Sequence, residues 1–270
     1  MSTTSFLLLM LGGGIAGTIG AMLGLGGGVF LVPFLALVFG LPMHQAIATS
    51  ILAVIATSSA GAAMNVERQT VNVRLGMVLE IATVAGAIFG GVTSNLLSNE
   101  ILSRIFASLL LFVSFMMIWR LKHSRDTAPV VTDGVFPSNY KDEATGLVVS
   151  YSARKLPAVL GVSLIAGNIS GLLGVGGGIF KVPAMHLLSG IPMKAATATS
   201  NFMIGVTAAA SAFIYFSHGH LNPTVVAPAV LGVLAGSFFG IQVNRRIHGS
   251  LLTWIFAGVL LLVSIKMFWR

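Results

Sequence analysis

The chain has 270 residues, of which 56% are hydrophobic and only 8% are charged. Soluble domains carry about 25% charged residues, so this composition excludes a water-soluble globular protein and indicates that lipid is the solvent. The net charge of +8 does not indicate nucleic-acid binding, because the Lys and Arg residues lie in short links between apolar segments. Cysteine is absent from the sequence, which excludes disulfides and thiol chemistry.

Ten apolar segments follow one another along the chain. Eight of them have 18 to 23 residues, close to the roughly 20 residues that a helix needs to cross a bilayer. The second segment of each half has only 12 or 13 residues, follows a glycine-rich run and contains a proline. The expected fold class is therefore an all-α polytopic membrane protein with eight to ten transmembrane segments and Gly-rich broken helices. The segments are 4–23, 28–40, 45–64, 75–97, 101–120, 156–173, 178–189, 195–216, 224–244 and 250–269.

The two halves of the chain are copies of one unit. With a constant offset of 150 residues and no gap, 15 of 27 positions are identical between Gly24–Ser50 and Gly174–Ser200. The same offset relates further identical residues over 16–120 and 166–270. The sequence therefore predicts an internal repeat of five segments per unit.

The positions of the basic residues predict that the two units are inverted. Arg68 and Arg74 lie between the third and fourth segments of the first unit, whereas Arg245 and Arg246 lie between the fourth and fifth segments of the second. Such an exchange is expected if equivalent loops face opposite sides of the membrane. With both chain termini outside, the basic side chains gather in the cytoplasm; the alternative, parallel units with both termini inside, gives a weaker bias. The expected cytoplasmic set is Arg68, Arg74, Arg120, Lys122, Arg125, Lys141, Arg154, Lys155, Lys194, Arg245 and Arg246, against Arg104, Lys266 and Arg270 outside.

The expected domain organisation has three parts. Residues 1–122 form the first transmembrane repeat, 123–153 a cytoplasmic linker loop, and 154–270 the second repeat. We expect the polar linker to be flexible; the alternative is a small hairpin around Asp133-Gly134.

The glycine runs that precede the two short segments are the main candidate site. Irregular backbone at membrane depth persists only where it is buried in protein or lines a wet cavity. Adjacent glycines bring bare amides close to a ligand, and the following helix would direct its partly positive N-terminus to the same place. Two matched breaks predict a central anion site; the simpler alternative is that the glycines only permit close helix packing. The candidate glycines are Gly26, Gly27, Gly28, Gly176, Gly177 and Gly178.

Polar residues follow each break and extend the candidate substrate site. They are Thr49 and Ser50 in the first unit and Thr199, Ser200 and Asn201 in the second. Hydroxyls in membrane helices often bond only their own backbone, which is the alternative for each of the four. The Asn201 amide cannot be satisfied in that way, so it ranks above them.

Two ionisable residues lie inside apolar segments, where charge is costly and usually functional. Lys181 directly follows the second glycine run and is expected to neutralise an anionic substrate. Glu80 is a proton-coupling candidate or a partner of Lys181. Snorkelling to the interface is the alternative for both. His44 and Lys194 are expected near a membrane edge, and His186 is a weaker candidate.

Other classes of function find little support. No GxxxxGK[ST] phosphate loop, HExxH or GxSxG occurs, so we expect no ATP use, no enzymatic activity, no cofactor and no metal. A secondary transporter is the main hypothesis, and an anion channel or a carrier of another small organic anion is the alternative.

The doubled GxGGGxFxVP…GxPM…AxATS signature, in Gly24–Ser50 and Gly174–Asn201, resembles the sulfite exporter TauE/SafE family, also called toluene sulfonate uptake permeases. The resemblance implies a bacterial inner-membrane carrier for sulfite, thiosulfate or an organosulfonate such as sulfoacetate, with a coupling of export to protons. It leaves the oligomeric state open, a homodimer included.

Overall fold

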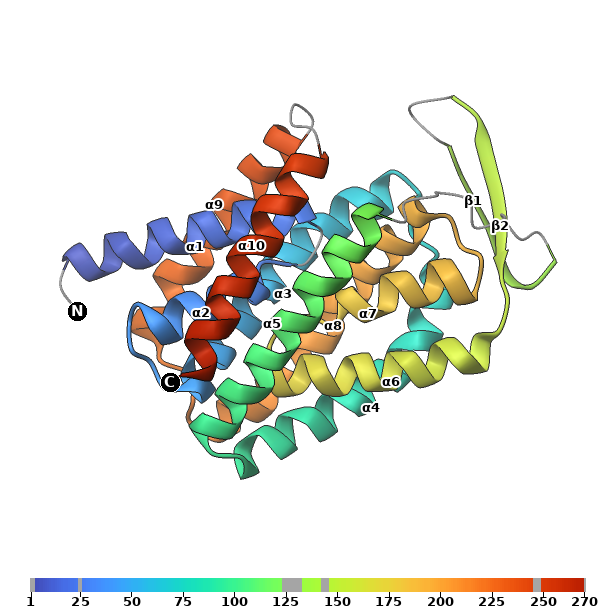
Figure 1. Ribbon diagram of the computed structural model, residues 1–270. Coiled ribbons are helices and arrows are strands. Elements are labelled where there is room, and N and C mark those ends of the chain that lie inside the picture. The colour runs from blue at the N-terminus through green and yellow to red at the C-terminus, as the bar shows by residue number, and fades with distance from the viewer. Residues whose placement is uncertain (1–2, 24–25, 123–132, 142–145, 245–248, 270) are drawn as a thin grey trace.

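The computed structural model describes residues 3–23, 26–122, 133–141, 146–244 and 249–269. The helices form one bundle, and a two-stranded hairpin projects at one end of it (Figure 1). The elements in chain order are α1 (Thr3–Leu23), α2 (Gly28–Leu37), α3 (Met43–Glu67), α4 (Val73–Leu96), α5 (Asn99–Lys122), β1 (Val135–Lys141), β2 (Val148–Ala153), α6 (Leu156–Leu173), α7 (Gly178–Pro183), the π-helical turn η1 (Ala184–Leu188), α8 (Met193–Ser217), α9 (Pro223–Asn244) and α10 (Gly249–Phe268).

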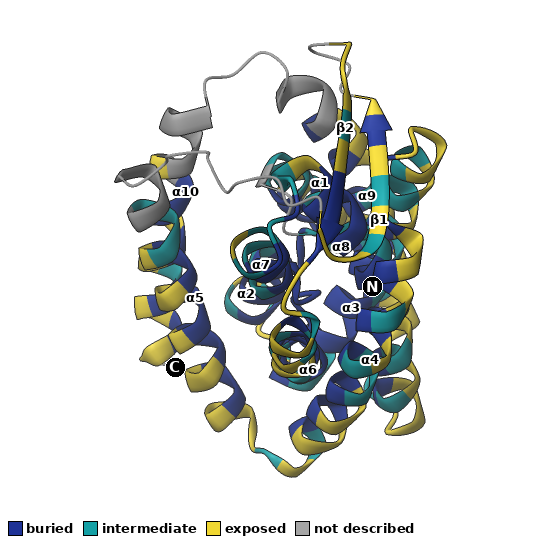
Figure 2. Cartoon of the chain, turned by 90° about the vertical axis from the view of Figure 1, so that its right-hand side faces the viewer, coloured by how far each residue is buried: buried dark blue, intermediate teal, exposed yellow. Residues whose placement is uncertain are grey.

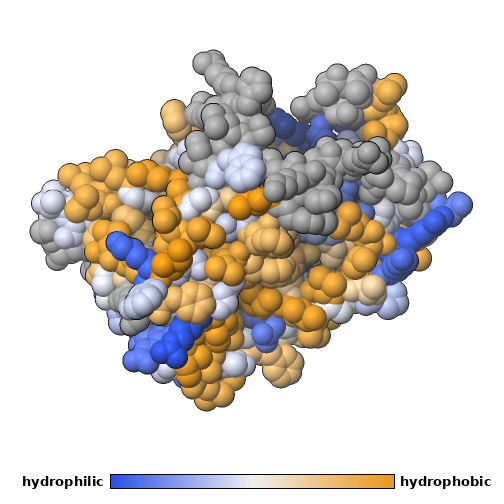
Figure 3. All heavy atoms as spheres, in the orientation of Figure 1, coloured by the Kyte–Doolittle hydropathy of each residue, from blue (hydrophilic) through white to orange (hydrophobic). Residues whose placement is uncertain are grey.

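The predicted class of an all-α polytopic membrane protein is confirmed. Within the described ranges, α1, α3, α4, α5, α6, α8 and α9 are long and apolar enough to cross a membrane. Their outer faces carry large hydrophobic side chains, such as Leu11, Phe89 and Phe213, which are 64%, 68% and 74% exposed. Figure 2 places the buried positions on the inner faces of the helices, and Figure 3 shows hydrophobic residues over much of one face of the molecule. Such a surface needs lipid around it.

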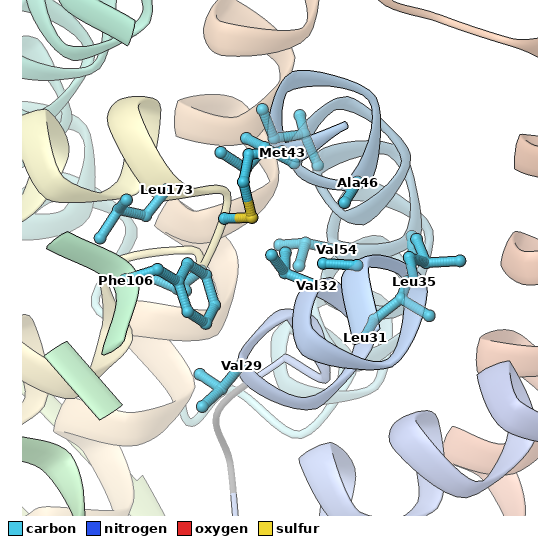
Figure 4. Close-up of a cluster of buried hydrophobic side chains, with 14 of the residues drawn as sticks. Val29, Leu31, Val32, Leu35, Met43, Ala46, Val54, Phe106 and Leu173 are labelled. Atoms are coloured by element: carbon cyan, nitrogen blue, oxygen red, sulfur yellow. The ribbon is translucent and has the colours of Figure 1, made fainter. Parts of the chain in front are cut away.

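The two short segments form broken helices inside the bundle, as expected. Helix α2 is buried along most of its length, and Val29, Val32 and Leu35 lie in one cluster with side chains from α3, α5 and α6 (Figure 4). Its counterpart α7 ends at Pro183 and continues as the π-helical turn η1. Proline removes a backbone donor and disturbs the helical ladder, and the altered turn directly follows Pro183; the matching Pro33 leaves α2 helical to Leu37.

Two helix pairs pack so closely that only glycine fits between them. A Cβ atom on Gly236 of α9 would lie 1.9 Å from the Gly14 carbonyl oxygen of α1, and one on Gly86 of α4 would lie 2.0 Å from the Leu164 carbonyl oxygen of α6. Small residues at such spacing let membrane helices approach through their backbones. Close helix packing is therefore also a role of glycines outside the two glycine runs.

Contacts between the halves occur in reciprocal pairs. The Ser114 hydroxyl donates to the Ala257 carbonyl at 2.8 Å, and the Ser264 hydroxyl donates to the Ala107 carbonyl at the same distance. Each residue of one contact is offset by 150 from a residue of the other. The pairing requires α5 and α10 to run antiparallel. This is the geometry expected of inverted units, whose orientation in the membrane stays a prediction.

The expectation of a flexible linker is wrong for its described part. Strands β1 and β2 pair antiparallel, with Tyr140 opposite Val149 and Ser138 opposite Tyr151. Tyr140 and Tyr151 are buried against the apolar ends of α6, η1 and α8, and the area they remove from water favours an ordered hairpin. The alternative hairpin was also misplaced, because Asp133-Gly134 precedes β1 and is not the turn. The first strand expected for that hairpin, at 130–132, lies outside the described residues.

Candidate functional site

The second half of each glycine run adopts a backbone that favours glycine. Gly26 and Gly27 have φ angles of 73° and 78°, and Gly176 and Gly177 have φ angles of 78° and 68°. Gly27 and Gly177 then cap the N-termini of α2 and α7, which begin at Gly28 and Gly178. Both runs therefore interrupt the chain before a short helix, as predicted; residues 24 and 25 lie outside the described ranges.

The two breaks meet inside the bundle. A Cβ atom on Gly28 would lie 2.5 Å from the carbonyl oxygen of Gly174, and 2.8 Å from the Ser50 hydroxyl. The Ser50 hydroxyl donates to the same Gly174 carbonyl at 2.9 Å. The chain thus brings residues 146 positions apart in the sequence into contact through backbone atoms, with α3 holding the second break.

A cavity of about 220 Å³ begins at the first break. It runs along α3 toward the C-terminal end of that helix, where Asn65 and Arg68 lie. Two predicted residues, Gly26 and Asn201, line it, and no carboxylate occurs among its described lining residues. The full lining is Gly17, Gly20, Ala21, Gly26, Thr57, Ser58, Ala60, Gly61, Met64, Asn65, Arg68, Asn201, Ile204, Ser237 and Phe238.

An anion fits the chemistry of this cavity. The Arg68 guanidinium supplies a permanent positive charge and a planar set of donors. The amides of Asn65 and Asn201 add neutral donors. The hydroxyls of Thr57, Ser58 and Ser237 also line the cavity, but in this state they donate to backbone carbonyls of their own helices. Thr57 also contacts the break directly, since its hydroxyl lies 3.3 Å from the Gly26 carbonyl oxygen. A small oxyanion therefore suits the positive charge and the amide donors that line this cavity.

The hydroxyls of Thr49, Thr199 and Ser200 lie outside the cavity lining, and those of Thr49 and Thr199 contact backbone. The Thr49 hydroxyl donates to the Gln45 carbonyl one turn earlier at 2.8 Å. The Thr199 hydroxyl accepts from the backbone N–H of Asn72 at 3.0 Å. The buried Ser200 hydroxyl has no hydrogen-bond partner among the described residues. Thr49 therefore bonds its own helix, which was its alternative, whereas Thr199 contacts the backbone before α4. Contact of either residue with substrate stays untested.

Lys181 and Glu80 come together at a third residue that the sequence did not single out. The Lys181 ammonium lies 3.5 Å from the Thr207 hydroxyl, which donates to Glu80 Oε1 at 2.6 Å. Lys181 is 1% exposed and Glu80 is 7% exposed, so neither snorkels to an interface. The expected pairing of the two residues is thus mediated by Thr207. The available signal was the repeat itself, because Thr207 matches Thr57 of the cavity at the offset of 150.

The region of the second unit that matches the cavity is closed. Tyr215 stands at the position that matches Asn65, and its side chain is fully buried. Its hydroxyl lies 2.6 Å from Ser94 Oγ on α4 and 3.1 Å from the Gly171 carbonyl oxygen on α6. The tyrosine therefore ties three helices together where the first unit leaves a cavity.

Three histidines lie beside Tyr215 at the same end of the bundle. His220 stacks on His44 and on His218, with ring centroids 4.8 Å and 6.3 Å apart, and one of its ring nitrogens lies 2.7 Å from Asn95 Oδ1. Burial, together with the neighbouring His44 and His218 rings, lowers the pKa of His220. His44 was expected at a membrane edge but not in a cluster.

The remaining two candidates from the sequence, His186 and Lys194, contact other groups of the protein. His186 Nδ1 lies 2.8 Å from the Ile191 carbonyl oxygen. The Lys194 ammonium lies over the Tyr140 ring of the hairpin, 5.7 Å from its centroid. Both contacts are structural.

The fold and cavity define a polytopic membrane transporter with two broken helices at its centre. The chain belongs to the sulfite exporter TauE/SafE family, whose family model matches residues 9–267. It is 29% identical to the probable membrane transporter protein YunE of Bacillus subtilis, with 98% of each chain covered. It is 26% identical to a probable membrane transporter protein of Xylella fastidiosa strain 9a5c (100% and 97% covered) and 29% identical to one of Haemophilus influenzae (98% of each). No solved structure gives a significant match.

Proposed function

We propose that the protein is a secondary transporter that carries a small sulfur-containing anion across the bacterial inner membrane by alternating access. The substrate class is sulfite, thiosulfate or an organosulfonate such as sulfoacetate, and the expected direction is proton-coupled export. The observation that carries the proposal is the cavity that ends at a glycine break and is lined by Arg68, neutral donors and no described carboxylate. No catalytic role is proposed for any residue.

The proposed topology places both termini outside and the mouth of the cavity in the cytoplasm. Arg68 lies at the C-terminal end of α3, on the side to which the positive-inside rule assigns it. The reciprocal contacts between α5 and α10 support two inverted units. Cysteines introduced for Gln69 and for Ile247 (a residue outside the described ranges) should both react with an impermeant maleimide from the cytoplasmic side only. Reaction of the two from opposite sides would contradict the inversion.

In the proposed transport cycle, the open half of the protein closes and the closed half opens. In the described state the cavity beside Arg68 is open, and Tyr215 closes the matching region of the second unit. Rocking of one unit against the other would close the first region and open the second. Substrate at the glycine breaks would then meet Lys181 and Glu80, which lie with Thr207 in the second half.

The test is transport of radiolabelled sulfite by purified protein in liposomes. Saturable uptake and counterflow are expected, whereas a high ohmic conductance would instead favour a channel. Arg68→Gln should lower the apparent affinity about tenfold or more, because it removes the charge that lines the cavity. Arg74→Gln is the matched control, since this exposed arginine lies nearby at the start of α4 and does not line the cavity. Equal affinities of the two variants would refute the proposed site.

Two further substitutions test the residues predicted from the sequence. Lys181→Ala and Asn201→Ala should each weaken binding of sulfite or sulfoacetate, measured by ligand-induced thermal shift, without unfolding the protein. Unchanged affinity in both variants would contradict their assignment to the substrate site.

A further inference from the structure

The buried contact between Lys181, Thr207 and Glu80 lacks the geometry of a simple structural ion pair. One carboxylate oxygen of Glu80 accepts from Thr207 at 2.6 Å, and the other, Oε2, is buried without a hydrogen-bond partner among the described residues. The lysine reaches the carboxylate only through the threonine hydroxyl. A buried ion pair stabilises a fold only when its remaining oxygens are satisfied, so the arrangement is a poor brace.

The same contact can hold Glu80 with or without a proton. The Thr207 hydroxyl has a second acceptor, the Met203 carbonyl oxygen, at 3.0 Å. When Glu80 is ionised, Thr207 donates to its carboxylate. When Glu80 carries a proton, the carboxyl can donate to Thr207, and Thr207 can turn its own proton to Met203. A change of charge at Glu80 therefore needs no rearrangement of the helices.

Lys181 is the one charged group that acts on Glu80 from the described parts of the elements around it. The described residues of α6 include no titratable side chain. The other titratable groups of α4, η1 and α8 are Arg74, His186, Lys194 and Tyr215. Arg74 is exposed near the start of α4, and the other three have the separate partners described above.

A buried lysine compensates one negative charge. In the empty carrier this charge is the Glu80 carboxylate. An anion that binds beside Lys181 while Glu80 is still ionised leaves one uncompensated negative charge in a site of low dielectric constant, which is unfavourable.

We propose that Glu80 occupies the place of the substrate's charge at Lys181 and takes up one proton when the anion binds. The ionised carboxylate and the ammonium, together with one anion and one proton, give the neutral carboxyl and an ammonium paired with the anion. Atoms and charges balance, and no bond other than O–H is formed. Anion and proton consequently cross the membrane together, and a monovalent anion moves without net charge. This coupling rests on the proposed transport function and makes its direction depend on the two gradients. An inward proton gradient favours uptake of the anion, so export requires an outward anion gradient that exceeds it.

The test counts protons during binding. Methanesulfonate and isethionate are suitable probes, because both organosulfonates are monovalent and fully ionised near neutral pH and bring no proton of their own. Titration calorimetry in two buffers of different ionisation enthalpy gives the number of protons taken up per anion. We expect about one for the wild-type protein, with an affinity that falls about tenfold per pH unit where Glu80 is ionised in the empty carrier.

Glu80→Gln removes the titrating group but keeps its size and an acceptor for Thr207. This variant should bind the anion with no proton uptake and an affinity independent of pH. Glu67→Gln, at the exposed end of α3, is the matched control and should behave as the wild type. The double variant Lys181→Met/Glu80→Gln should fold with a melting temperature close to that of the wild type, and it should bind the anion more weakly and without proton uptake.

The possible outcomes distinguish the proton coupling from the proposed transport function. One proton per anion in Glu80→Gln, or anion binding without proton uptake in the wild type, overturns the coupling and leaves the proposed transport function standing. Loss of folding in the double variant shows that the contact is a structural brace and also overturns it. A wild-type protein that binds and transports neither anion overturns the proposed function and the coupling with it.

Discussion

Tyr215 offers the sharpest test of alternating access. In Tyr215→Phe the aromatic ring stays in place, and only the hydroxyl that lies 2.6 Å from Ser94 Oγ and 3.1 Å from the Gly171 carbonyl oxygen is lost. Loss of one buried hydrogen bond costs about 1–2 kcal/mol. If this bond exists only in the described state, the population of the opposite state should rise about 5- to 30-fold.

The assay uses the absence of native cysteine. Ser211→Cys places a thiol in the closed region of α8, and Gly61→Cys places one at the matching position in the open cavity. The Gly61 site accepts the change, because the nearest atom to an added Cβ lies at 3.9 Å. In the Tyr215→Phe background, an impermeant maleimide should label Cys at 211 faster from outside and Cys at 61 more slowly from the cytoplasm.

The test depends on the labelling rates at positions 211 and 61 changing in opposite directions. A tyrosine that only stabilises the fold would, when weakened, loosen the bundle and raise labelling at both positions. Faster labelling at both, or no change at either, would therefore refute the assignment of Tyr215 as a closing residue.

Three further predictions concern stability. Gly86→Ala should lower the melting temperature by several degrees or prevent folding, because its Cβ would lie 2.0 Å from a backbone oxygen of α6, whereas Gly161→Ala, with open space around it, should have no effect. Ser50→Ala should cost about 1 kcal/mol of unfolding free energy by chemical denaturation, since it loses the bond to the second glycine break. Because the pKa of His220 is lowered in the folded protein, the unfolded chain takes up a proton first as the pH falls. The stability that the contact with His44 contributes is therefore complete above pH 6.5 and declines below it. His220→Gln should abolish that part of the pH dependence of the melting temperature, and an unchanged profile would contradict the cluster's role.

The repeat made much of the architecture predictable. Identical spacing of glycine, proline and apolar runs in two copies indicates the same local structure twice, because helix breaks depend on the residues at the break itself. The starts of α2 and α7 at Gly28 and Gly178 follow from this. The hairpin was not predictable in the same way. Whether β1 and β2 form an ordered hairpin depends on the apolar surface that α6 and α8 present to Tyr140 and Tyr151.

The candidate site likewise has a part that the sequence predicts and a part that it does not. Sequence alone determined that lipid surrounds the chain, that two glycine breaks interrupt it, and that Lys181 and Glu80 lie where charge is costly. These conclusions depend on composition, on local backbone preferences and on position within one segment.

Only the tertiary structure decided which side chains share a site. It brought Arg68, Asn65 and Asn201 around one cavity, placed Thr207 between Lys181 and Glu80, and closed the matching region with Tyr215. These neighbours come from helices of different units, and their proximity follows from how the helices of the two units pack against one another. Such distances depend on the whole bundle and are not encoded in the spacing of residues along one helix.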